Sequence, residues 1–130
     1  MVEAVGIAPM RTPQAFILAL CGELDMATVS PCAAEMMTLL TAAFVLPPPM
    51  VVLDLRQLRF CSAAGMDLVL DVTNQCAERG VSTCLWVSAE GIVRRMVDLL
   101  EIGERVRVVV HPTPMCTSRF PRSGPPHDSC

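Results

Sequence analysis

Short, continuous apolar runs alternate along the chain with longer stretches in which apolar residues recur every three or four positions. The runs at 15–21, 51–55 and 81–87 predict strands covered on both faces, because a half-exposed strand would alternate polar and apolar residues. A shorter run at 106–110 predicts a strand at the edge of the sheet. This order predicts a single α/β domain, in which helices pack against a mixed sheet of about four or five strands.

Three helices are predicted in the intervals, each from a capping residue. The first starts at the Ser-Pro pair at 30–31 and is ended by the prolines at 47–49. The second covers about residues 63–79 with Ser62 at its N-cap, and Ser88 caps the third. The apolar stripe of the third helix contains Ile92, Val93, Met96, Leu99 and Leu100.

The composition changes near both ends of the chain. Residues 1–12 mix Gly, Pro and charged residues without periodicity, which predicts a flexible N-terminal arm. Residues 111–130 repeat Pro, Ser and Gly, which predicts a disordered Pro-rich tail. The predicted domain therefore spans 13–110, with a turn at the Gly-Glu-Leu-Asp segment of 22–25.

Composition and charge exclude several classes of function. The 130 residues carry a formal charge of −3 and no clustered basic face, which argues against nucleic-acid binding. No uninterrupted apolar run reaches the roughly 18–20 residues of a membrane span, and the N-terminus lacks a signal-peptide pattern. We therefore expect a cytoplasmic protein that binds neither nucleic acid nor membrane.

Neither a metal site nor a cofactor is predicted. The sequence contains no phosphate-binding loop of the G-x-x-x-x-G-K-[ST] type. His111 with Cys116, and His127 with Cys130, lie in the Pro-rich tail without a C-x-x-C pair, which disfavours a metal site.

Three motifs follow one another in the chain: Gly-Glu-Leu-Asp at 22–25, Val-Val-Leu-Asp-Leu at 51–55, and the segment from Phe60 to Met66. In this order and spacing they resemble the STAS domain of bacterial anti-sigma-factor antagonists, over residues 14–110. The resemblance implies a binding protein without enzymatic activity or cofactor. Such antagonists bind an anti-sigma factor, often an ATP-binding one with a kinase fold, and thereby release its sigma factor.

The resemblance also implies a regulatory serine, which this chain lacks. In the family, the partner phosphorylates the serine of a D-S-[ST]-G motif, and the added charge breaks the complex. A gapless alignment on Phe60 and Gly65 places Ser62 at the Asp, Ala63 at the serine and Ala64 at the second hydroxyl residue. We therefore expect an antagonist not regulated by phosphorylation at the usual position. A shifted alignment, which needs a gap, leaves Ser62 as an alternative phosphorylation site.

A loop leading into a helix N-terminus exposes backbone N–H groups, and the 22–25 turn is expected to lie beside it. We expect the partner to bind this combined surface. The predicted partner-binding residues are Gly22, Asp25, Cys61, Ser62, Ala63, Ala64, Gly65, Met66 and Asp67. Asp67 also begins an acidic line with Asp71 and Glu78, which is either a partner contact or a solvated helix face.

Cysteine chemistry offers another form of regulation. Cys61 directly precedes the predicted helix N-terminus, an environment that lowers thiol pKa values and favours the thiolate. A redox switch at the binding surface would use Cys61 with Cys76, Cys84 or Cys116. The alternative is that Cys61 packs in the core as a small hydrophobic residue.

Two other functions stay open from the sequence. One is a scaffold or accessory STAS module in a stress-signalling or transport complex. The other is a thiol-based redox protein, which the missing C-x-x-C motif disfavours.

Overall fold

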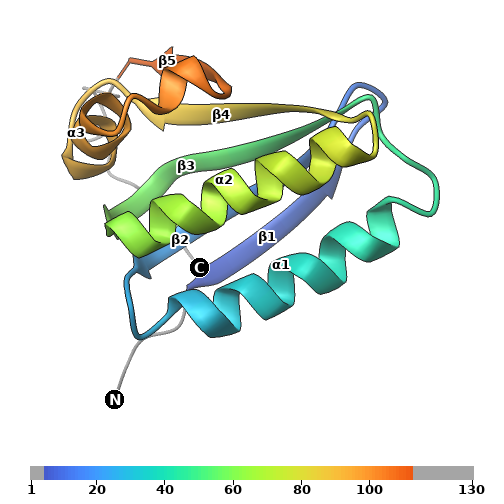
Figure 1. The fold of residues 1–130 in the computed structure, drawn as a ribbon, viewed down its shortest axis with the longest axis horizontal. Coiled ribbons are helices and arrows are strands. Elements are labelled where there is room, and N and C mark those ends of the chain that lie inside the picture. The colour runs from blue at the N-terminus through green and yellow to red at the C-terminus, as the bar shows by residue number, and fades with distance from the viewer. Residues whose placement is uncertain (1–4, 113–130) are drawn as a thin grey trace, which may run out of the picture.

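The computed structural model describes residues 5–112, which form one five-stranded sheet with helices packed against it (Figure 1). The sheet order is β1-β2-β3-β4-β5, with β1 antiparallel to β2 and every other neighbouring pair parallel. The predicted α/β domain with a mixed sheet is therefore confirmed. In chain order the elements are β1 Gly6–Arg11, β2 Phe16–Leu24, α1 Val29–Ala43, β3 Met50–Cys61, α2 Ala63–Glu78, β4 Ser82–Ser88, α3 Ile92–Leu99, the 3-10 helix η1 Ile102–Glu104 and β5 Arg107–His111.

The main core lies between the sheet and the helices. Strand side chains alternate between the two faces, and Leu18, Leu53 and Leu85 occupy corresponding positions on β2, β3 and β4. All three are fully buried in one cluster with Met36 of α1 and Met66 of α2. The two helices lie side by side across this face of the sheet (Figure 1).

The opposite face of the sheet carries a smaller apolar cluster and an ion pair between the buried Asp54 and the exposed Arg56. Val52 and Cys84, next to each other in register, belong to this cluster. Two residues further along β3, the carboxylate of Asp54 accepts two hydrogen bonds from the guanidinium of Arg56, at 2.8 and 2.9 Å. The guanidinium also lies 5.1 Å from the ring centre of Trp86, so Asp54 holds Arg56 over the Trp86 ring on this face of the sheet.

The N-terminal segment differs from the sequence prediction. Gly6–Arg11 form strand β1, so the flexible arm predicted for residues 1–12 is wrong over this part. The segment has no strand pattern of its own, and its pairing with β2 stabilises the strand. Pro9 is tolerated because β1 is an edge strand. The predicted tail at 111–130 lies outside the described residues, apart from His111, which ends β5, and Pro112.

Two helices begin at residues other than those predicted. The N-cap position of α1 is occupied by Thr28 and not by Ser30. The Thr28 hydroxyl accepts a hydrogen bond from the Asp25 N–H, which holds Thr28 in the loop before the helix. Helix α3 starts after Gly91, whose φ of 109° favours glycine, whereas Ser88 still belongs to β4. The N-cap role predicted for Ser62 is confirmed.

Two strands are longer than their apolar runs. β2 continues to Leu24, so most of the predicted 22–25 turn is strand, with a register shift and a φ of 106° at Gly22. β3 continues past Leu55 to Cys61, through a polar stretch that pairs with β2 but not with β4.

The apolar stripe predicted for α3 is only partly buried. Val93 is buried, but Ile92, Leu99 and Leu100 are 38%, 69% and 44% exposed. The helix ends at Leu99, so Leu100 lies beyond it, and both leucines are exposed at this end of the helix. Within residues 5–112, no helix has the length and apolar character needed to cross a membrane.

Candidate functional site

The two segments predicted to form the binding surface meet at the end of the sheet where β2 and β3 finish. The backbone N–H of Ser62 donates a hydrogen bond to the carbonyl of Leu24, at 2.9 Å. This bond joins the chain leaving β2 to the first turn of α2. The structure therefore brings the 22–25 segment and the start of α2 into one surface.

Ser62 caps helix α2. Its hydroxyl oxygen accepts a hydrogen bond from the Gly65 N–H at 3.2 Å, and its carbonyl accepts one from the Met66 N–H at 2.9 Å. Its backbone is extended, as N-cap residues usually are. The next side chain, Ala63, is exposed, so a methyl group faces solvent at the position that the sequence resemblance assigns to the phosphorylated serine.

Gly65 allows the first turn of α2 to pack directly on the ends of β2 and β3. A Cβ atom at this position would lie 2.8 Å from the Cys61 Sγ and 2.9 Å from the Leu24 Cγ. Both neighbours are fully buried. This glycine is therefore required by close packing, since its φ does not lie in the left-handed region.

The loop before α1 is held by Asp25. Its Oδ1 atom accepts hydrogen bonds from the Ala27 and Thr28 N–H groups, at 2.9 and 3.1 Å. The Thr28 hydroxyl donates to the Glu23 carbonyl at 2.8 Å and accepts from the Asp25 N–H at 2.9 Å. These bonds form a turn that fixes the loop in place beside Ser62.

Burial divides the predicted partner-binding residues into two groups. Gly22, Cys61, Gly65 and Met66 are buried, so they shape the surface from below and cannot contact a partner directly. The residues that reach solvent are Asp25, Ser62, Ala63, Ala64 and Asp67. The acidic line of Asp67, Asp71 and Glu78 is exposed along α2.

The thiol chemistry predicted for Cys61 is wrong. Burial raises the pKa of its thiol to about 12, and the neighbouring Cys32 adds to this increase. The side chain is fully buried, so desolvation of the thiolate outweighs any effect of the helix N-terminus. Burial also raises the thiol pKa values of Cys76 and Cys84. Cys116 lies outside the described residues, and the core-packing alternative for Cys61 is confirmed.

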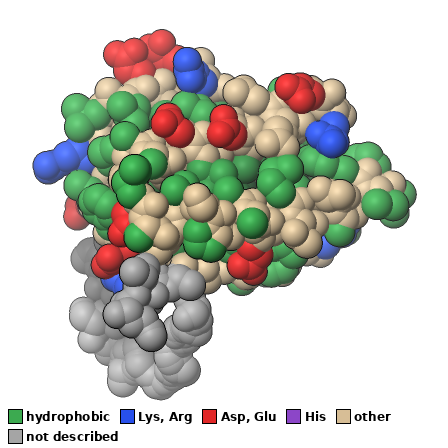
Figure 2. Space-filling view, turned by 60° about the horizontal axis from the view of Figure 1, so that its bottom comes forward, with side chains coloured by type: hydrophobic (Ala, Val, Ile, Leu, Met, Phe, Trp, Pro, Cys, Tyr) green, Lys and Arg blue, Asp and Glu red, His purple; other side chains and the backbone are tan. Residues whose placement is uncertain are grey.

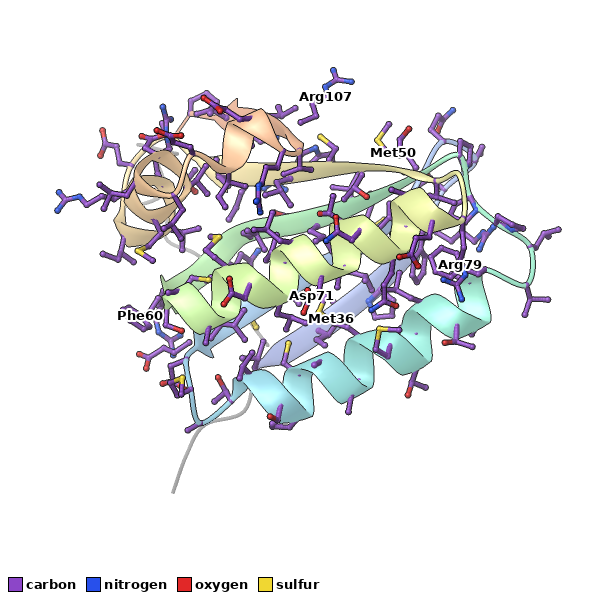
Figure 3. The ribbon with its side chains drawn as sticks, viewed as in Figure 1. Met36, Met50, Phe60, Asp71, Arg79 and Arg107 are labelled. Atoms are coloured by element: carbon purple, nitrogen blue, oxygen red, sulfur yellow. The ribbon has the colours of Figure 1, made fainter. Side chains whose placement is uncertain are left out.

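Two exposed apolar side chains at this end of the sheet were not predicted. Met26, in the Asp25 loop, is 77% exposed, and Phe60, near the end of β3, is 39% exposed. Figure 3 places Phe60 at the end of the molecule where α2 begins, far from Arg79 at the other end of that helix. A Met directly after the Gly-Glu-Leu-Asp segment was the available signal, because loop residues seldom bury a long side chain.

The described residues contain no cluster of three or more His, Cys, Asp or Glu side chains arranged to hold a metal ion. The groups exposed at the site are the apolar side chains of Met26 and Phe60 and the carboxylate of Asp67, and the Ser62 hydroxyl is engaged in the cap of α2.

Comparisons with known proteins agree with this arrangement. The model of the STAS domain family matches residues 7–114. An anti-sigma factor antagonist from Mycobacterium paratuberculosis superposes with a TM-score of 0.63 at 14% identity, over 80% of this chain and 84% of that chain. The anti-sigma factor antagonist SpoIIAA, in its unphosphorylated form, superposes with a TM-score of 0.62 at 20% identity, over 88% and 92%. At these identities the superpositions establish the fold alone, and no curated protein matches the sequence.

Proposed function

The chain belongs to the STAS domain family, and from this premise we propose that it is an anti-sigma-factor antagonist, which binds an anti-sigma factor and releases its sigma factor. The observation that carries the proposal is the joining of the Asp25 loop to the start of α2 through the Ser62–Leu24 hydrogen bond. Met26 and Phe60 add exposed apolar area to that surface, and Met and aromatic residues are enriched at protein interfaces. The two superposed structures are themselves antagonists by description.

The proposed antagonist is not switched by phosphorylation at the usual position. Ala63 has no hydroxyl, and the hydroxyl of Ser62 is engaged as the cap of α2. A phosphate adds about −1.5 to −2 charges, and its absence leaves the surface in its unphosphorylated, binding-competent form. Redox control through Cys61, Cys76 or Cys84 is disfavoured, since all three thiols are buried.

The proposed partner is an ATP-binding anti-sigma factor with a kinase fold, and the proposed place of action is the cytoplasm, where sigma factors act. The alternative, a scaffold or accessory module in a stress-signalling or transport complex, would use the same surface for another partner. The two differ in what the purified protein retains from a lysate of the source cell.

A pull-down followed by a displacement assay tests the proposal. We expect the protein to retain an ATP-binding anti-sigma factor and, when added to a purified complex of that factor with its sigma factor, to release the sigma factor on a sizing column. Recovery of only transport or stress-complex subunits would favour the scaffold. A Phe60→Ser variant should weaken binding by about tenfold, whereas Leu46→Ser, at an exposed position of the α1–β3 loop, should not.

The same purified pair tests the regulation. Incubated with ATP and the anti-sigma factor, the Ala63→Ser variant should incorporate phosphate and dissociate, whereas the unaltered protein should do neither. Phosphate found at Ser62 of the unaltered protein would contradict the proposed constitutive state.

A further inference from the structure

A groove lies between helix α2 and the segment that joins α3 to η1. Its volume is about 360 Å³, and its lining begins at Asp67, in the first turns of α2, next to the surface proposed to bind the partner. Met66 and Leu70 line it from α2, and Leu100 and Ile102 line it from the opposite side. The α2–η1 groove is therefore continuous with the proposed binding surface.

The apolar part of the groove is only half covered. Met66 and Ile102 are fully buried and form its base, whereas Leu100 at its rim is 44% exposed and the adjacent Leu99 is 69% exposed. Two neighbouring leucines left in water at the end of a short helix are available for burial by another molecule. Figure 2 shows hydrophobic side chains between groups of acidic ones on the face that carries α2.

The rim of the groove is acidic. Asp67, Glu101 and Glu104 line it with a single guanidinium, that of Arg105. All three acidic residues are exposed. Among the described residues, none of the three carboxylates accepts a side-chain hydrogen bond or forms an ion pair. Their charge is therefore available to a cation from outside the chain.

The turn that builds this rim is held in an unfavourable backbone conformation. Glu101 has a φ of 53° and a ψ of 42°, the left-handed region, and it is the one non-glycine residue among residues 5–112 with a positive φ. This conformation ends α3 and places Leu100 and Glu101 side by side at the groove. Glycine is the usual residue in the left-handed position at a helix end. The chain has Glu101 there instead, although glycine would adopt this conformation at a lower cost in free energy.

We propose that the α2–η1 groove binds an apolar side chain of the partner that is flanked by a Lys or Arg. The apolar side chain packs against Leu100 and Ile102, and the cation meets the carboxylates of Asp67 and Glu104. The proposal rests on the proposed function, because the groove continues the surface that receives the anti-sigma factor. It adds a second contact region, on the α3 side of α2, to the region around Ser62.

Binding of purified variants to the purified anti-sigma factor tests the groove. We expect Leu100→Ser and Glu104→Arg each to raise Kd by about tenfold, since both remove or reverse a central contact. The matched controls are Leu46→Ser and Glu35→Arg, which change an exposed leucine and an exposed glutamate that do not line the groove and should leave Kd within about twofold. Because Leu100 and Glu104 are themselves exposed, circular dichroism should show that all four variants fold.

The outcomes separate the two proposals. If the unaltered protein binds no anti-sigma factor, the proposed function fails. If it binds and the Leu100 and Glu104 variants bind as the controls do, the groove proposal alone is overturned. A rise in Kd with salt concentration that Glu104→Arg reduces would support pairing with a cation of the partner.

Discussion

The packing around Gly65 makes a quantitative expectation possible for the Gly65→Ala variant. The added methyl group would lie 2.8 Å from the Cys61 Sγ, 2.9 Å from the Leu24 Cγ and 3.1 Å from the Leu24 Cδ2. Both neighbours are fully buried, so neither can move into solvent to make room. The first turn of α2 must shift outward, away from the end of β2.

Two opposing contributions set the magnitude. Alanine is favoured over glycine in a helix by up to about 1 kcal/mol. Overpacking of a filled core costs about 1–3 kcal/mol. With the full helix gain, the net loss is about 0–2 kcal/mol. We expect the free energy of unfolding to fall by the upper half of this range, about 1–2 kcal/mol, because the contacts are too short to be relieved by side-chain rotation alone.

Urea denaturation followed by circular dichroism measures this change. The matched control is Gly103→Ala, because a Cβ atom there meets no atom within 4 Å and the residue's φ is not positive. We expect the control to be neutral or slightly stabilising. A double-mutant cycle with Cys61→Ala should show a coupling of about 1 kcal/mol, since removing the sulfur atom makes room for the methyl group.

The reasoning fails if Gly65→Ala is as stable as the unaltered protein, or if it shows no coupling to position 61. Either result would mean that the first turn of α2 moves freely against the sheet. The Ser62–Leu24 bond would then not hold the two halves of the binding surface in a fixed arrangement.

Three further expectations follow from the same contacts. The buried thiol of Cys61, with its pKa raised to about 12, should resist alkylation until the protein unfolds. The unfolded chain loses this proton near the ordinary thiol pKa of 9.0, whereas the folded chain keeps it, so the free energy of unfolding should fall as pH rises from 9.0 toward 12. The fall should be less steep in Cys61→Ala, and an equal slope in both proteins would contradict this expectation. Asp25→Ala should lower the free energy of unfolding by about 1 kcal/mol in urea titrations, since the Ala27 N–H loses its acceptor and the Thr28 N–H loses one of its two acceptors. Glu23→Ala should change the stability little, because its carboxylate is exposed and 3.9 Å from Arg59. Glu101→Gly should raise the melting temperature, and the free energy of unfolding by about 0.5–1 kcal/mol, because glycine adopts the left-handed conformation without strain. Glu104→Gly should raise neither. A destabilised Glu101→Gly variant would show that the left-handed conformation of Glu101 is not strained.

Local signals in the sequence located the centre of the fold. The apolar run at 51–55 falls within β3, and the run at 81–87 lies within β4 except for Val81, which precedes the strand. The serine before a run of small residues is the N-cap of α2. These features could be predicted because a buried strand and a helix cap each have a local sequence signature, a continuous apolar run and a capping residue.

The features that sequence reasoning missed depend on pairing between distant segments. Gly6–Arg11 contains Gly and Pro and becomes a strand only because β2 offers a free edge. The polar end of β3, from Arg56 to Phe60, is extended because it pairs with β2 alone, next to an edge that β4 leaves open. No pattern within either segment encodes those partners.

The candidate site was predictable in its position but not in its chemistry. The order of motifs placed Ala63 at the start of α2, and the structure agrees. Of the two alternatives for Cys61, the structure supports core packing, and burial of the thiol raises its pKa despite the adjacent helix terminus. The exposure of Leu99 and Leu100 follows from the left-handed turn at Glu101, which apolar periodicity does not reveal.

The pairing of β1 with β2 also decides where the domain can be cut. A truncated chain beginning at residue 13, the boundary that composition favours, would lose all of β1 and uncover the hydrogen-bonding edge of β2. That edge belongs to the apolar segment from Phe16 to Cys21, which has the character of an aggregation-prone strand. The truncation would remove the edge strand that carries Pro9 and expose an edge that can pair with other copies of the chain. The shortened protein should therefore aggregate under conditions in which the full chain stays in solution.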